Sequence, residues 1–248
     1  MNGISRFVTW VAPVVLAGGL WATPAQARPA CQDDPARAHE LRVLDEAQIT
    51  DLVAQSTLRA VPDKLLHMLR DLVAASPRLR GGPAIHLLAY DDPELNAYAA
   101  DHGLVILTSA LWSDRAGLSD DELAAVMAHE LAHIESRHAL VEACGLLQRL
   151  DAPDLSIEAA RERIAPALFH PRSEASQAAR ELLHAQEHAA DRRAIELLRL
   201  TGRNPHAMAG ALARIHGGTP AALNLLMGSS HPELQERLAK ARAAAGAR

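Results

Sequence analysis

Aromatic side chains are scarce in this chain of 248 residues, because phenylalanine, tryptophan and tyrosine together make up only 3% of it. So few rings cannot build the stacking platforms on which proteins bind nucleic-acid bases or sugars. A block of basic residues is also lacking, and the formal net charge is -5. Both absences argue against a nucleic-acid partner.

Long apolar segments are lacking after the N-terminal region, so the sequence predicts no transmembrane domain in the mature chain. The composition is that of an ordinary globular protein, with 49% hydrophobic and 22% charged residues. This balance excludes general disorder, and the length permits a substantial core. A core built mostly from alanine and leucine favours helices. Peripheral contact of the folded chain with a membrane stays open.

The N-terminus has the three-part layout of a secretory signal peptide. Arg6 is the first charged residue, an apolar run spans 7–21, and small residues occupy both positions of an A-x-A cleavage site that ends at Ala27. We therefore expect a cleaved signal peptide over 1–27 and an exported protein. An uncleaved N-terminal anchor and a lipoprotein attached through Cys31 are the alternatives.

Cysteine is rare too, and both copies, Cys31 and Cys144, follow the expected signal peptide. In an oxidising compartment they could form a disulfide that ties the new N-terminus to the middle of the domain. The sequence does not show whether the backbone brings them close enough. Two separate, inert thiols are the alternative.

Hydrophobic periodicity and turn residues predict a flexible lead-in over 28–38 and a single domain over 39–248. Helices are expected over 39–59, 63–76, 120–143, 174–200, 205–216 and from 231 onward, and strands over 85–90, 96–100 and 104–108. Residues 101–103 suit a hairpin loop between the last two strands. The segments 145–173 and 217–230 are expected to be less regular. The pattern predicts an α+β fold, mainly helical, with a small β-sheet.

The helix expected from Asp120 contains His129-Glu130-Leu131-Ala132-His133. Because the two histidines are four residues apart, both imidazoles lie on one face and can bind the same small cation. Glu130 lies close to this face without having to be a ligand. The arrangement is that of the H-E-x-x-H zinc peptidases. Apolar neighbours predict a buried helix, where these polar groups would be costly to desolvate without a partner.

A catalytic zinc ion needs a third protein ligand and an open position for water. The second long helix offers Glu187, with Asp191 one turn later on the same face. Glu187 could bind the metal while Asp191 holds a ligating histidine from behind. His184 is a competing ligand, whereas His188 points away from this face. Spacing alone is equally consistent with an exposed face on which both carboxylates pair with nearby arginines.

The motifs together resemble those of the HtpX and CAAX-prenyl-protease family of zinc metallopeptidases, and most of all its soluble, exported bacterial members of BepA type. The matching pieces are Asn96-Ala97-Tyr98-Ala99, Gly103–Leu111, His129–His133, Arg137-His138, Glu187–Asp191, Ser230-His231-Pro232 and Arg237. The resemblance implies a zincin-like metallopeptidase fold, Glu187 as the third ligand, one Zn²⁺ per chain, and the bacterial periplasm as the compartment. We expect no helical-repeat domain after the peptidase domain.

The predicted site implies a mechanism of peptide-bond hydrolysis. Glu130 acts as general base toward a zinc-activated water and then protonates the leaving amine. His231 and Tyr98 are candidates for stabilising the oxyanion, and His231 could instead occupy the open position and keep the enzyme latent. His138 is expected to be structural rather than a ligand. By resemblance, an extended substrate lies along an edge strand that includes 103–108.

These features predict a zinc metalloendopeptidase that hydrolyses unfolded or misassembled envelope proteins. A latent or non-proteolytic zinc-bound chaperone or scaffold of the cell envelope is the alternative. A helical binding domain with an accidental motif is a third interpretation, and it predicts no tightly bound metal. The intact Glu130 argues against a loss of catalysis, but not against latency.

Overall fold

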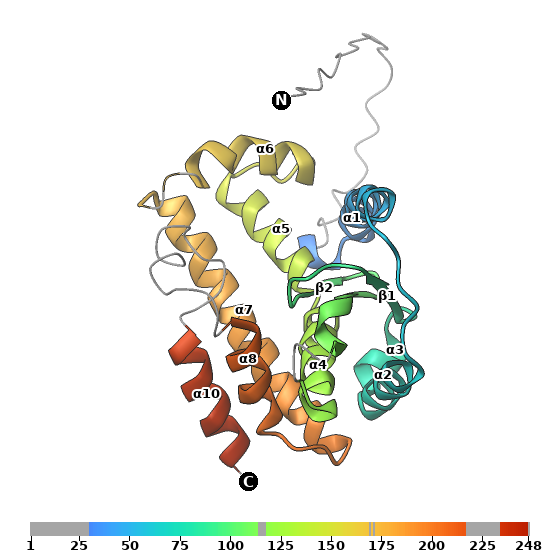
Figure 1. Cartoon of the computed structure of the whole chain (residues 1–248). Coiled ribbons are helices and arrows are strands. Elements are labelled where there is room, and N and C mark those ends of the chain that lie inside the picture. The colour runs from blue at the N-terminus through green and yellow to red at the C-terminus, as the bar shows by residue number, and fades with distance from the viewer. Residues whose placement is uncertain (1–29, 114–117, 169, 171, 217–233, 248) are drawn as a thin grey trace, which may run out of the picture.

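The structure is a computed structural model that describes residues 30–113, 118–168, 170, 172–216 and 234–247 (Figure 1). Its helices are η1 (Cys31–Asp33), α1 (Pro35–Gln55), α2 (Asp63–Ala75), α3 (Pro77–Gly81), η2 (Ser109–Trp112), α4 (Asp120–Ser136), α5 (His138–Arg149), α6 (Ile157–Leu168), α7 (Glu174–Leu200), α8 (Ala207–His216) and α10 (Leu234–Gly246). Its strands are β1 (His86–Tyr90), β2 (Ala97–Ala100) and β3 (Leu104–Thr108). The predicted signal peptide and loop 217–230 lie outside the described residues. The mainly helical α+β fold with a small sheet is confirmed.

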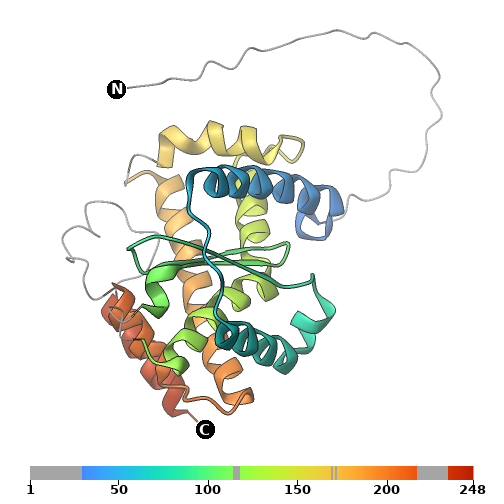
Figure 2. The same cartoon turned by 45° about the vertical axis from the view of Figure 1, so that its right-hand side comes forward.

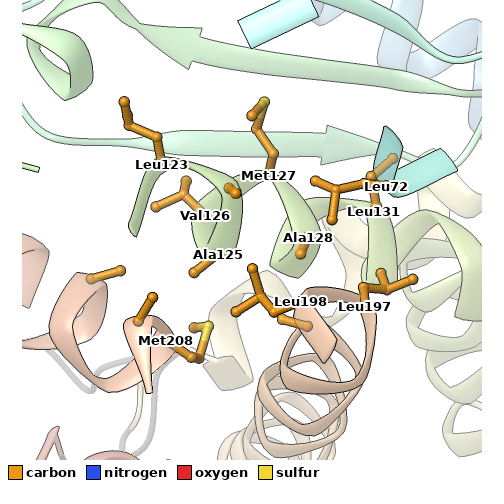
Figure 3. Packing of buried hydrophobic residues seen from close by; sticks show 14 of the residues in the cluster. Leu72, Leu123, Ala125, Val126, Met127, Ala128, Leu131, Leu197, Leu198 and Met208 are labelled. Atoms are coloured by element: carbon orange, nitrogen blue, oxygen red, sulfur yellow. The ribbon is translucent and has the colours of Figure 1, made fainter. Parts of the chain in front are cut away.

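Helix α4 lies between the sheet on one side and helices α7 and α8 on the other (Figure 3). Leu123 and Met127 point from α4 toward the strands, whereas Ala128 lies above Leu197 and Leu198 of α7. These side chains are at most 2% exposed, so they form a continuous apolar core. A small residue such as Ala128 at the contact lets the two helices approach closely. The core thus holds α4 and α7 side by side.

The start of α4 agrees with the sequence, because Ser119 and Glu122 form a capping box. The Glu122 amide donates to Oγ of Ser119, and the Ser119 amide donates to Oε2 of Glu122. These bonds satisfy two amide donors that the first turn of a helix leaves without a partner. The helix that carries the two histidines therefore begins where local sequence chemistry predicts.

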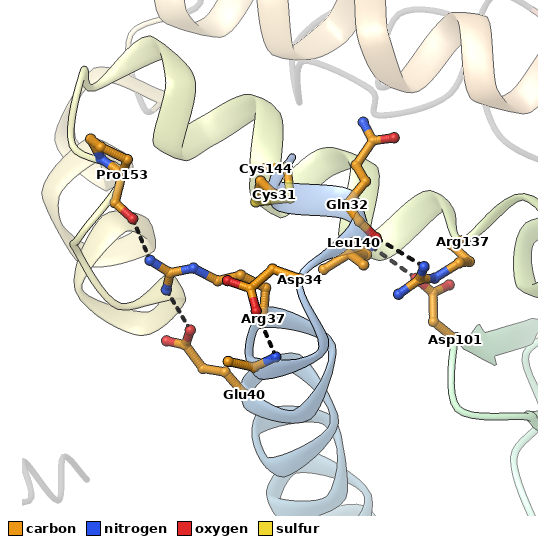
Figure 4. Close-up of a disulfide and its surroundings, with 11 residues drawn as sticks. Cys31, Gln32, Asp34, Arg37, Glu40, Asp101, Arg137, Leu140, Cys144 and Pro153 are labelled. Carbon is orange, nitrogen blue, oxygen red and sulfur yellow. Dashed lines mark hydrogen bonds and ion pairs between the residues drawn. A yellow bond between two sulfur atoms is a disulfide. The ribbon is translucent and has the colours of Figure 1, made fainter. Parts of the chain in front are cut away.

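The predicted end of this helix near residue 143 is wrong. Arg137 adopts the left-handed conformation, with φ 52° and ψ 47°, and α5 continues from there in a new direction. Two contacts with distant segments support the break (Figure 4). Oδ2 of Asp101 accepts a hydrogen bond from the Leu140 amide in the first turn of α5, and Nη1 of Arg137 donates to the Gln32 carbonyl. Tertiary contacts thus replace one long helix by two.

The sheet has the strand order β1-β3-β2, with β1 parallel and β2 antiparallel to β3. The predicted hairpin is confirmed, and Gly103 in its loop has φ 104°, a conformation that glycine adopts readily. Because β3 is the central strand, the expectation that 103–108 forms an edge strand is wrong. The outer side of β1 is covered, since the Arg59 amide donates to the Ala89 carbonyl. In the described part of the chain, β2 is the open edge.

Helices α1, α5 and α6 build a second, smaller apolar cluster, and α6 lies alongside α1 in Figure 2. Helix α1 begins at Pro35, so the lead-in expected over 28–38 already contains its first turn. The segment 145–173 is more regular than predicted, because α6 buries Ile157 completely against this cluster.

A disulfide between Cys31 and Cys144 ties η1 to α5 (Figure 4). Among the described helices, none combines the length and hydropathy that membrane crossing requires.

Candidate metal centre

Helices α4 and α7 bring together His129, His133 and Glu187. The Nε2 atoms of the two histidines lie 3.1 Å apart. Oε2 of Glu187 lies 3.6 Å from Nε2 of His129, and Oε1 lies 3.5 Å from Nε2 of His133. One nitrogen or oxygen atom from each residue falls within 4.8 Å of the others, and His129 and Glu187 are buried. The predicted ligands therefore surround one point that could hold a metal ion.

Asp191 lies behind His129, with Oδ1 3.0 Å from Nδ1 of the imidazole. Burial by itself would lower the pKa of His129, but Asp191 and the charges of Glu187 and Glu130 raise it. Burial also favours a neutral Asp191, but His129 and Arg237 outweigh it and lower the pKa of this carboxyl to about 2. A charged Asp191 holds the imidazole proton on Nδ1, so Nε2 directs its lone pair into the site.

His138 lies behind His133, and their Nδ1 atoms are 2.9 Å apart. Burial and then the neighbouring histidines His133 and His129 lower the pKa of His138 to about 4, so this ring is neutral at pH 7. One of the two Nδ1 atoms therefore donates to the other. The Gln186 side chain on α7 donates to the His138 carbonyl at 3.0 Å and holds this first residue of α5 in place. His138 thus orients His133 from outside the group of three.

Arg237 on α10 is 2% exposed and contacts both carboxylates of α7. Its Nε and Nη2 donate to Oδ2 and Oδ1 of Asp191 at 2.9 and 2.7 Å. Its Nη1 lies 2.8 Å from Oε2 of Glu187. A bidentate guanidinium–carboxylate pair of this kind is strong and fixes the orientation of both groups.

The polar groups of this site suit a divalent cation. Glu130, Glu187 and Asp191 are buried acidic residues, and Arg237 is the buried base that contacts two of them. Negative charge therefore exceeds positive charge within this group, which is costly in a buried place without a cation. Two imidazole nitrogens and one carboxylate oxygen around one point form a donor set that zinc commonly takes. The residues thus fit a metal ion.

Glu130 follows His129 on α4 and is 8% exposed. Its negative charge contributes to the raised pKa of His129 and to that of Arg237, so it lies within electrostatic reach of the site. The two candidates for stabilising the oxyanion, Tyr98 and His231, are not placed in this way. The Tyr98 side chain is 45% exposed on β2, and its hydroxyl accepts a hydrogen bond from Nδ2 of Asn96 at 2.7 Å. His231 lies outside the described residues.

The two histidines of α7, His184 and His188, are not part of the group of three. Nε2 of His188 lies 3.1 Å from Oε1 of Glu236 on α10, so this side chain points away from the group, in agreement with its position on the helical wheel. His184, the competing ligand, is not part of the group either, and its Nε2 is buried. Of the candidates on α7, the structure brings Glu187 to the two histidines of α4.

Sequence reasoning named Arg237 only as a matching piece of a resemblance and gave no reason for its position. Arg237 contacts Asp191 across 46 residues of sequence, so no local spacing could show the contact. The same holds for Gln186, which reaches the carbonyl of His138 from 48 residues away. Arg237 lies next to Leu238 on a helix, so its burial could have been predicted. Because arginine is rarely buried unless it is paired, that prediction would have indicated a role for Arg237.

Comparisons with known proteins show what this chain is similar to. The model of peptidase family M48 matches residues 63–245. The beta-barrel assembly-enhancing proteases of Escherichia coli strain K12 and of Shigella flexneri are each 31% identical over 172 residues, which make up 63% of this chain and 34% of theirs. The chain therefore spans about a third of the length of these relatives. The crystal structure of S. mikatae Ste24p aligns at 16% identity with a TM-score of 0.47, over 83% of this chain and 61% of that one.

Proposed function

Because the chain belongs to peptidase family M48, we propose that it is a zinc-dependent endopeptidase of the bacterial envelope. Its substrates are unfolded or misassembled proteins, whose peptide bonds it hydrolyses with an activated water. The observation that carries the proposal is the convergence of His129, His133 and Glu187 from two helices on one point. The carboxylate of Asp191 behind His129 supports it, because such partners set the tautomer of a metal-binding imidazole.

When it is bound, a zinc ion lowers the pKa of a water molecule toward neutrality and polarises a carbonyl group. The residues of the chain supply the rest of the reaction. Glu130 takes a proton from the water as general base and passes it to the leaving amine. Asp191 and His138 keep the imidazoles of His129 and His133 oriented, since each contacts the Nδ1 atom that faces away from the site. The cost of reorientation during turnover is thereby reduced.

The open edge of the sheet offers a place for an extended substrate. The Thr108 amide donates to the Asn96 carbonyl, so these residues form a hydrogen-bonded pair of the hairpin. Bonded and non-bonded pairs alternate along an antiparallel ladder, so Ala97 and Ala99 direct their backbone N–H and C=O groups away from β3. Because β2 also contacts α4, a peptide that pairs with it would pass close to the histidine helix.

Recognition through backbone atoms depends little on the amino-acid sequence of the substrate, which suits unfolded proteins as substrates. The matched relatives are named for enhancing β-barrel assembly, and this name supports misassembled envelope proteins as targets. The disulfide between Cys31 and Cys144 supports an oxidising compartment such as the periplasm. The predicted signal peptide over 1–27 would deliver the chain there.

The proposal is tested on the purified protein by metal analysis and by cleavage of a reduced, permanently unfolded protein. We expect about one zinc ion per chain and a cleavage rate that falls about 100-fold or more in Glu130→Gln, which keeps its zinc. Glu196→Gln is the matched control, because Glu196 is an exposed glutamate of α7 that pairs with Arg193. Its cleavage rate should equal that of the parent.

Two results would contradict the proposal. A folded parent that takes up no zinc, even from added metal, would favour a binding domain with an accidental motif. A Glu130→Gln variant that cleaves at the parental rate would exclude Glu130 as the base. If cells that carry Glu130→Gln keep the wild-type phenotype, the cellular role is that of the zinc-bound scaffold rather than of a protease.

A further inference from the structure

The first turn of α5 has no capping side chain of its own. Arg137, the residue before it, is in the left-handed conformation, and its guanidinium carries no hydrogen-bond acceptor. The first amides of a helix need acceptors from outside the helix, and a side-chain oxygen commonly supplies one to the third residue. In α5 the third residue is Leu140, because the helix begins at His138.

Asp101 supplies this acceptor from the hairpin loop between β2 and β3 (Figure 4). Its Oδ2 accepts a hydrogen bond from the Leu140 amide at 2.9 Å, across 39 residues of sequence. Burial raises the pKa of Asp101 to about 6 although the amides of Leu140 and Ala139 act against it, so both amides lie near the carboxylate. Asp101 therefore acts as the N-cap of α5 from a distant element, and its negative charge faces the positive end of the helix dipole.

The start of α5 bears on the metal centre because His138 is its first residue. Nδ1 of His138 lies 2.9 Å from Nδ1 of His133. The buried apolar residues of α5 belong to the small cluster of α1 and α6 rather than to the core around α4. The contacts of the first turn of α5 therefore decide where the ring of His138 lies relative to α4.

We propose that Asp101 is a positioning residue for the metal centre, which caps α5 and thereby fixes His138 behind the imidazole of His133. The inference rests on the proposed function, because it concerns a ligand of the same metal site. Asp101 acts through His138 and is not itself a ligand. Loss of a partner that orients a metal-binding imidazole typically weakens metal binding by a factor of about 10 to 100.

A role of Asp101 confined to the hairpin explains less. The Gly103 amide donates to the Ala100 carbonyl at 2.9 Å, and Gly103 has the positive φ of the turn, so backbone contacts close the loop. Gln186 holds the carbonyl of His138 from α7, but this contact leaves the amides of the first turn to another acceptor. The side chain of Asp101 thus serves α5 rather than its own loop.

The test is the zinc affinity of the full chain, measured by competition with a chromogenic chelator on variants whose helix content is unchanged. Asp101→Ala removes the acceptor and should weaken zinc binding about tenfold. Asp101→Asn keeps an acceptor for the Leu140 amide and should bind zinc like the parent. Asp45→Asn is the matched control, because Asp45 lines the same cavity but faces His102 at 3.8 Å, and its zinc affinity should also be parental.

A double-mutant cycle tests the route through His138. His138→Ala should weaken zinc binding by about as much as Asp101→Ala, and the double variant should bind zinc no more weakly than either single variant. A merely structural role of Asp101 predicts losses that add instead. Additive losses, or parental zinc affinity in a folded His138→Ala protein, would overturn the proposal.

Parental zinc affinity in a folded Asp101→Ala protein would also overturn it. Equal weakening in Asp101→Asn or in Asp45→Asn would do the same, because charge in the cavity rather than the cap would then be the cause. If Asp101→Ala does not fold, Asp101→Leu decides in its place, since leucine keeps the branched shape without an acceptor. Failure of the proposed function gives a different result, because a folded parent would then take up no zinc.

Discussion

Replacing both Cys31 and Cys144 with serine should destabilise the small cluster of α1, α5 and α6 far more than the main core. The disulfide closes a loop with a sequence separation of 113 residues. The chain-entropy relation for a loop of this length gives about 5 kcal/mol of stabilisation, which is an upper bound because native strain and residual structure reduce it. Because η1 and α1 pack on the small cluster rather than on α4 and α7, they can open locally while the main core stays folded, and the disulfide restrains this local opening directly.

In the variant, noncovalent contacts still hold α1 against the small cluster, but they stabilise it by less free energy than the disulfide does. The Ile157 amide donates to Oε1 of Glu40. Nη2 of Arg37 donates to the Pro153 carbonyl (Figure 4). These bonds are worth about 1 kcal/mol each, so they cannot replace the covalent link. We therefore expect α1 to open more often, while the histidine helix α4 stays closed.

Amide hydrogen exchange followed by mass spectrometry measures this difference directly. The upper bound of about 5 kcal/mol corresponds to exchange in α1 that is faster by at most about three to four orders of magnitude, because each 1.4 kcal/mol is a factor of ten. Peptides from α4 and α7 are the internal control, and the parent in reductant should match the double serine variant. Exchange in α1 that rises less than about tenfold, or that rises equally in α4, would refute the reasoning.

Three further changes have defined outcomes. Burial raises the pKa of Asp101 to about 6 from 3.8, so its contribution to stability is complete near pH 4 and is lost as the pH rises through 6. Asp101→Asn keeps an acceptor for the Leu140 amide and should raise the free energy of unfolding by about 1–3 kcal/mol at pH 7, but change it little at pH 4. Equal changes at both pH values would contradict this expectation. Gly103→Ala should lower the free energy of unfolding, measured in urea, by at least about 2 kcal/mol, because φ is 104° and the new methyl group would collide with the Ala84 carbonyl. An unchanged urea midpoint would show that the hairpin can shift. Chelation of the metal should remove up to about 4 kcal/mol of linked binding free energy from the parent and so lower its thermal midpoint. The thermal midpoint of Glu187→Ala should hardly change, and equal shifts in both proteins would mean that the stabilising metal lies elsewhere.

Local chemistry explains which features could be predicted from sequence. The capping box of Ser119 and Glu122 is complete within four residues, so the start of α4 needed no tertiary information. The spacing of His129 and His133 likewise places both rings on one face of any helix. The hairpin loop ahead of β3 follows from its glycine. Each of these depends on residues that are neighbours along the chain.

Distant contacts explain the features that were predicted wrongly or not at all. The break at Arg137 depends on Asp101 and Gln32, and nothing in the sequence around Arg137 announces a left-handed residue. The central place of β3 depends on its parallel pairing with β1, which periodicity does not reveal. Residues 145–173 were expected to be less regular, yet apolar burial of Ile157 stabilises α6 there.

The sequence by itself determined the chemistry that this protein has available: two histidines and a glutamate at helical spacing, a carboxylate pair one turn apart, and two cysteines. Only the tertiary structure decided which of these groups meet. It placed Glu187 rather than His184 beside the two histidines, closed the disulfide, and brought Arg237 to both carboxylates. The physical reason is that spacing sets the direction of a side chain on its own helix, whereas packing of the apolar core sets which helix lies opposite.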